Sequence, residues 1–108
     1  MKRVLTILTL FMASAAHSMM IMNKGDWSKL TKGEQVGYVI AAIDSTYFVL
    51  SSDENEKTRR RTIAICIQGM DTDDFIGIID MRYQDLENYG SPPWFQLDKG
   101  LERVCGVT

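Results

Sequence analysis

Cys66 and Cys105 are the only cysteines in this chain of 108 residues, and they are the side chains with the clearest chemical potential. If they bond to each other, they close a loop of about 40 residues, for which the chain-entropy model gives roughly 4 kcal/mol of stabilisation. Such a bond forms and persists in an oxidising compartment. The sequence therefore predicts a disulfide if the chain leaves the cytoplasm.

The first 18 residues have the pattern of a bacterial signal peptide. Lys2 and Arg3 give a positive start, residues 4–12 form an apolar run, and residues 13–18 offer small side chains for cleavage. The apolar run is about half as long as a bilayer-spanning helix, so a membrane anchor is the weaker interpretation. We expect cleavage after Ser18 and export of a single domain, residues 19–108, to the periplasm.

Cleavage would change both the charge and the chemistry of the chain. Loss of Lys2 and Arg3 takes the formal net charge from −2 to −4, which argues against nucleic acid and anionic membranes as partners. The only histidine, His17, would also be lost. No imidazole then remains to activate a nucleophile or to join a zinc site. We therefore expect a protein that is not an enzyme and that uses no cofactor.

An acidic cluster is the remaining candidate for chemistry. Asp71, Asp73 and Asp74 lie close together, but their spacing is not that of a calcium-binding EF-hand loop. Carboxylates also suit the first turn of a helix, where free N–H groups and the helix dipole favour negative charge. We expect a helix start here rather than a metal site, and a small carboxylate-dependent enzyme is the alternative.

The longest amphipathic pattern predicts a helix over residues 31–51. Thr31 and Glu34 have the spacing of a capping box. Apolar residues then recur at helical spacing and form one stripe: Val36, Val39, Ile40, Ile43, Tyr47 and Leu50. Before this helix, Trp27 is expected to cover one end of the core.

Small residues recur every four positions beside the apolar stripe, at Gly33, Gly37 and Ala41. Each glycine costs about 1 kcal/mol relative to alanine in a helix interior, and close packing is the natural compensation. A second helix or a second subunit is expected against this seam. Asp44 beside it is either a carboxylate at the solvent edge or a buried hydrogen-bond acceptor.

Residues 51–61 are polar throughout, with acids followed by three arginines. We expect a solvated loop or a frayed helix end, and the functional alternative is an exposed charged segment that contacts a protein. Residues 62–67 return to apolar types, as a short extended segment or one helical turn. Residues 68–70 are expected to form a turn.

Two further helices are expected after this turn. The first begins at Asp71 or Thr72, runs to about Asn88 and ends at Gly90. Its apolar stripe comprises Phe75, Ile78, Ile79, Tyr83 and Leu86. The second has Ser91 as its cap and Pro92 as its first residue. Its apolar face comprises Trp94, Leu97, Leu101, Val104 and Cys105, with Trp94 expected mainly in the core. The predicted fold is all-α, a small bundle of about four helices.

Several of these features together resemble the Rap/Tai family of type VI secretion immunity proteins. The shared pattern is a W-x-x-L start (Trp27 to Leu30), a helix with Tyr38, a cysteine segment at Cys66, a further helix, a proline, and a helix with a terminal cysteine. The resemblance covers about residues 26–106. It implies a small helical periplasmic protein, often dimeric, that blocks a cognate effector, commonly a peptidoglycan amidase, and so prevents self-intoxication.

Two regions are candidates for contact with such an effector, the charged segment 51–61 and the turn 87–94. The residues concerned are Asp53, Glu54, Glu56, Arg59, Arg60, Tyr89, Ser91 and Trp94. The seam of small residues is the candidate for a homodimer contact. The alternative function is that of a periplasmic acid-stress chaperone, which exposes apolar surface when its carboxylates take up protons.

Overall fold

The computed structural model describes residues 21–107, and all regular structure in that part of the chain is helical. The elements are α2 (Lys24–Ser28), α3 (Lys32–Tyr47), α4 (Glu54–Cys66), η1 (Ile67–Gly69), α5 (Thr72–Arg82), η2 (Leu86–Asn88) and α6 (Pro93–Val104), where η marks a 3-10 helix. The predicted all-α bundle with one disulfide is therefore confirmed. The predicted signal peptide, residues 1–18, lies outside the described residues.

Helix α2 is a short turn of helix that places Trp27 in the core. The side chain of Asn23 caps it by accepting a hydrogen bond from the backbone N–H of Asp26, at 2.9 Å. Trp27 is buried, its Nε1 donates to Oδ1 of Asp80 on α5 at 2.9 Å, and its ring meets Tyr38 of α3 edge-on. The expectation that Trp27 covers one end of the core is confirmed.

Helix α3 begins as predicted and ends earlier. Thr31 and Glu34 form the expected capping box. The helix stops at Tyr47, so the prediction of helix to residue 51 is wrong for its last four residues. The chain leaves the helix because it turns back along α4, where Arg60 donates to the backbone oxygen of Val49 at 3.2 Å. Asp44 lies at the surface, in agreement with the solvent-edge interpretation.

Helix α4 corrects the expectation of a loop over residues 51–61. Asp53 caps the helix by accepting from the backbone N–H of Glu56, at 3.0 Å. Glu56 then pairs with Arg60 four residues later, at 2.9 Å, in the favourable order of acid before base. Residues 62–66 continue the same helix. Only Ile63 of α4 is buried, so capping and ion pairs, rather than an apolar stripe, support this helix.

Helix α5 also begins as predicted, with a capping box between Asp71 and Asp74, and again ends early. It stops at Arg82 instead of near Asn88, because the Asn88 side chain donates to the backbone oxygen of Arg82 and turns the chain. Gly90 is therefore not its C-cap. Leu86, predicted in the apolar stripe, lies on η2 and is 75% exposed.

The start of α6 is shifted by one residue from the prediction. Pro92 is the N-cap residue and Pro93 the first helical residue, so Ser91 does not cap the helix. The carbonyl of Ser91 instead accepts a hydrogen bond from the hydroxyl of buried Tyr83, at 2.5 Å. This bond ties the turn before α6 to the end of α5.

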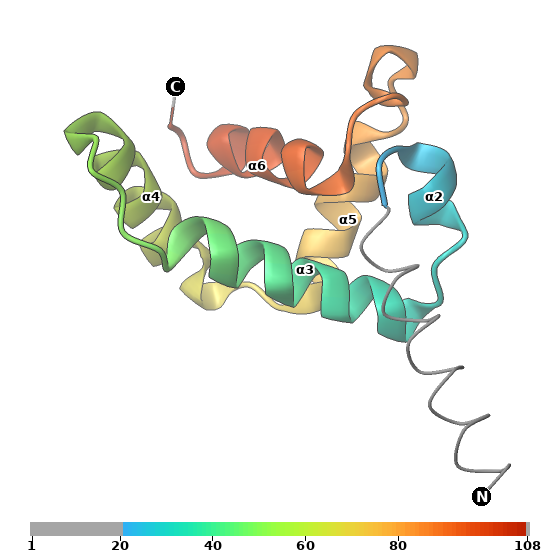
Figure 1. The fold of residues 1–108 in the computed structure, drawn as a ribbon, viewed down its shortest axis with the longest axis horizontal. Coiled ribbons are helices and arrows are strands. Elements are labelled where there is room, and N and C mark those ends of the chain that lie inside the picture. Colours follow the sequence, from blue (N-terminus) through green and yellow to red (C-terminus); the bar gives the residue numbers. More distant parts are fainter. Residues whose placement is uncertain (1–20, 108) are drawn as a thin grey trace, which may run out of the picture.

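The core lies where α5 packs against α6 and α3 packs against α5. Figure 1 shows α3 and α6 extending across the molecule, with α5 crossing behind them, α4 at one end and α2 at the other. The buried apolar cluster draws on every one of these helices: Ile21, Trp27, Leu30, Val39, Ile43, Tyr47, Ile63, Ile67, Phe75, Ile76, Ile79, Tyr83, Leu97 and Leu101. Gly100 of α6 is also buried, against Ile78 of α5.

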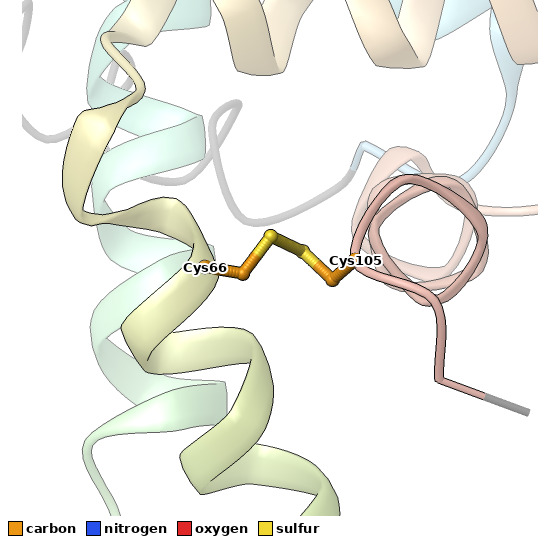
Figure 2. Close-up of a disulfide and its surroundings, with 2 residues drawn as sticks. All are labelled: Cys66 and Cys105. Carbon is orange, nitrogen blue, oxygen red and sulfur yellow. A yellow bond between two sulfur atoms is a disulfide. The ribbon is translucent and has the colours of Figure 1, made fainter.

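The disulfide between Cys66 and Cys105 is present, with 5.8 Å between the Cα atoms and a sequence separation of 39. Figure 2 shows it joining the end of α4 to the end of α6. It closes the loop predicted from the sequence. Within the described part of the chain, no helix has the length and apolar character needed to cross a membrane.

Candidate functional site

Arg59 does not point to solvent as expected for a residue of a charged loop; its side chain is directed toward α6. One of its terminal nitrogens, Nη2, lies 2.7 Å from Oδ2 of Asp98 and 2.6 Å from Oε1 of Glu102. The Arg59 side chain is only 18% exposed. The hydroxyl of Tyr47 on α3 donates to the other oxygen of Asp98, at 2.5 Å. We call Arg59, Asp98 and Glu102 the Arg59 cluster.

The contacts of the Arg59 cluster shift the pKa values of Arg59 and of the neighbouring Tyr47 in ways that follow from this geometry. Burial by itself would lower the pKa of Arg59, but the hydrogen bonds that Arg59 donates to the carboxylates of Asp98 and Glu102 outweigh it, and the pKa is raised. Burial raises the pKa of Tyr47 well above that of a free tyrosine, and the neighbouring Asp98 carboxylate adds to the effect. Both groups therefore keep their protons over the whole physiological range.

The other predicted contact residues of α4 are divided between internal bonds and the surface. Glu56 accepts from Arg59 and Arg60, and Arg60 also binds the carbonyl of Val49. Asp53 caps the helix. Glu54 has an exposed side chain that pairs with Lys57 at 3.3 Å. A partner that docks on α4 would therefore meet mainly the acidic first turn.

The second predicted region, the turn before α6, is held in place by backbone bonds. The amide of Lys24 donates to the carbonyl of Tyr89 at 3.0 Å, and the Lys24 ammonium lies 4.0 Å from the centre of the Tyr89 ring. The amide of Trp94 donates to the hydroxyl of Tyr38 on α3, at 3.0 Å. Trp94 is 51% exposed, so the expectation that it lies mainly in the core is wrong.

Trp94 forms one wall of a groove of about 430 Å³, and we call it the Trp94 groove. The rest of its lining comes from α3 and from the chain before α2: Ile21, Met22, Tyr38, Ala41, Ala42, Ser45 and Thr46. Ala41 and Gly37 also line an adjoining hollow of about 260 Å³. The structure thus brings Trp94 next to the seam of small residues, a proximity that sequence spacing does not reveal.

The seam itself lies on the surface of the described chain. A Cβ atom built on Gly33 or Gly37 would meet no other atom within 4 Å, and Ala41 is exposed. Of the two expected neighbours, a second helix is therefore not found among residues 21–107. The glycines are open because α5 covers the opposite face of α3, where Val39 and Ile43 are buried. Contact with a second subunit remains a prediction.

A third surface was missed by the sequence reasoning. Phe48, Val49 and Leu50 follow α3 as three consecutive exposed apolar residues, and Leu50 is 93% exposed. We call them the 48–50 strip. With Tyr47, Ser51, Lys57, Arg60, Arg61 and Ala64 they line a hollow of about 390 Å³. The sequence offered one signal for this surface, the apolar run 48–50 directly before the polar segment 51–61. Consecutive apolar residues that stay exposed usually have a function, such as binding a partner.

The acidic cluster behaves as a helix start. Asp71 and Asp74 bind each other's backbone amides, and Asp73 pairs with Lys32 of α3 at 2.6 Å. Among residues 21–107, no group of three or more histidine, cysteine or acidic side chains is arranged to hold a metal ion.

The described surface can therefore bind apolar or aromatic groups of a partner, through the Trp94 groove and through the 48–50 strip. In both places the backbone that carries the exposed side chains is fixed by hydrogen bonds. Such preorganisation lowers the entropic cost of association. No protein-family model, curated protein or solved structure matches this chain.

Proposed function

We propose that this chain is a periplasmic immunity protein that binds and blocks a cognate type VI secretion effector, a peptidoglycan amidase. The observation that carries the proposal is Trp94, half exposed on a fixed turn beside an apolar groove. Aromatic residues in such positions are the usual centres of binding energy at protein–protein interfaces. The resemblance of the sequence to the Rap/Tai family supplies the identity of the partner.

Rigidity supports an inhibitory role. The disulfide fastens α4 to α6, and the Tyr83–Ser91 and Tyr38–Trp94 bonds hold the turn that carries the exposed tryptophan. An inhibitor that presents a preformed surface loses little side-chain and loop entropy on binding. In this proposal the Trp94 groove contacts the effector, and the neighbouring seam of small residues supports a homodimer.

The partner can be sought with the full chain, exported and purified in its oxidised form, as bait for secreted proteins of the source organism. The captured protein is then purified and assayed for hydrolysis of peptidoglycan, with and without a stoichiometric amount of bait. Loss of that activity on binding is expected. A captured partner whose hydrolysis is unaffected by the bait would contradict the proposal.

The same assay tests the role of Trp94. Trp94→Ala should weaken the complex by about 2 kcal/mol or more, which is at least about 30-fold in Kd. Leu86→Ala is the matched control, because Leu86 is also exposed and apolar but lies on η2, outside the Trp94 groove. If Trp94→Ala and Leu86→Ala bind the partner with equal affinity, Trp94 does not contribute to the interface.

The alternative function, a periplasmic acid-stress chaperone, is favoured by one observation, the exposed 48–50 strip. Exposed consecutive apolar residues can bind unfolded segments of other proteins. Apolar-dye binding and suppression of client aggregation, followed from about pH 7 to about pH 2, distinguish the two functions, because carboxylates take up protons within this range. Strong client protection at low pH, without a specific partner at neutral pH, would favour the chaperone.

A further inference from the structure

Helix α4 is fastened to α6 at two separate points. The Cys66–Cys105 disulfide is one, and the Arg59 cluster, where Arg59 binds Asp98 and Glu102, is the other. Arg59 precedes Cys66 by seven residues on α4, and Asp98 precedes Cys105 by seven on α6, so two helical turns separate the fastenings on each helix. One fastening is covalent, and the other depends on charge.

Few apolar contacts support the first half of α4. Ile63 is the only buried residue of the whole helix, and it lies in the second half. Residues 54–62 are all exposed or partly exposed. The first half of α4 is therefore held mainly by its polar bonds, of which those of the Arg59 cluster reach α6.

We propose that the Arg59 cluster is an acid-released latch, which frees the first half of α4 at low pH while the disulfide keeps the second half attached. Arg59 keeps its charge at every pH of interest, so only the carboxylates can switch the latch. Side-chain carboxylates as a class take up protons near pH 4. An ion pair made by carboxylates stabilises the closed state above that range and is lost as the pH falls through it.

The groups around the Arg59 cluster favour opening once its carboxylates are neutral. Glu56 on α4 is a further carboxylate partner of Arg59 and also binds Arg60. Lys99 of α6 binds Glu102 at 3.4 Å, and Arg82 of α5 and Arg103 of α6 line the hollow next to Glu102. Tyr47 of α3 is neutral and its bond to Asp98 adds no opposing charge. Without its carboxylate partners, Arg59 therefore keeps a charge that none of these neighbours balances.

Opening of the latch would enlarge an apolar surface that already exists. Tyr47 lies under the Arg59 cluster, buried in the closed state, and is followed directly by the 48–50 strip. Release of the first half of α4 uncovers Tyr47 and joins it to that strip. The disulfide restricts the movement, so the helix can return to its place when the pH rises. The latch does not depend on the proposed effector.

Hydrogen exchange of the full oxidised chain, read by mass spectrometry and corrected for intrinsic rates, tests this at about pH 7 and about pH 3. At low pH, amides of residues 54–62 should lose protection at least about tenfold, while those of α5 keep theirs. The double variant Asp98→Asn with Glu102→Gln should show the same loss at neutral pH. Asp73→Asn is the matched control, since it breaks an exposed ion pair of similar length with Lys32.

Three outcomes would overturn the latch. Unchanged protection of residues 54–62 at low pH is one, and loss of protection in α5 to the same extent, which indicates global unfolding, is another. The third is a double variant that behaves at neutral pH like wild type and Asp73→Asn. If the double variant does not fold, Glu102→Gln replaces it, with the same expected loss and the same contrary result.

Discussion

Gly100 should be a position where even one added methyl group is costly. It is buried on α6, and a Cβ atom there would overlap Cγ2 of Ile78 on α5, with Cγ of Arg82 at 3.6 Å. Ile78 is β-branched and has one strongly preferred rotamer in a helix, so its methyl group cannot swing away freely. Gly100→Ala must therefore either strain Ile78 or separate α5 from α6.

The expected size of the effect follows from two opposing terms. Overpacking of this kind costs about 1–3 kcal/mol, and the rigid obstacle places this site toward the upper end. Replacement of glycine by alanine in a helix interior by itself stabilises the helix by about 1 kcal/mol. Gly100→Ala should therefore lower the free energy of unfolding by about 2 kcal/mol, measured by urea denaturation of the oxidised protein.

Gly37→Ala is the matched control, because the same chemical change on α3 meets open space. It should raise the free energy of unfolding by up to about 1 kcal/mol, so the two variants differ in sign. In an Ile78→Ala background the obstacle is gone, and Gly100→Ala should no longer destabilise. Wild-type stability or better for Gly100→Ala alone would refute the close α5–α6 packing.

Two further predictions concern the disulfide and the buried tyrosines. The variant Cys66→Ser with Cys105→Ser should lose about 2–4 kcal/mol of unfolding free energy, and reduction of wild type should match it; an unchanged Tm in both would contradict a stabilising bond. Burial is the main cause of the raised pKa values of Tyr47 and Tyr83. Their contribution to stability is therefore complete below about pH 10 and lost as the pH rises beyond it, so ultraviolet titration should show both ionising only with unfolding.

The sequence alone determined the starts of two helices, α3 and α5, and the covalent closure. Thr31 with Glu34 begins α3, and Asp71 begins α5, because a capping side chain bonds to amides only three residues away. Because capping involves only residues close together in the chain, the sequence is enough to predict it. The only two cysteines likewise gave the single possible pairing, Cys66 with Cys105.

Helix ends and exposure were decided by the tertiary structure. Helical spacing predicted one continuous stripe to Leu50, yet the chain turns at Tyr47 because Arg60 of α4 binds the carbonyl of Val49. Segment 51–61 was expected to be a loop since it lacks an apolar stripe. It is helical from Glu54 on, with support from ion pairs to α6 that are distant in sequence.

The candidate site was the least predictable part. Periodicity tells which residues share a face of a helix, but not which face another helix covers. Trp94 shares the predicted face of α6 with buried Leu97 and Leu101, yet it stays half exposed, in the wall of a groove that it forms with α3. Its place beside Ala41 depends on how α6 lies across α3, and only the packed helices fix that arrangement.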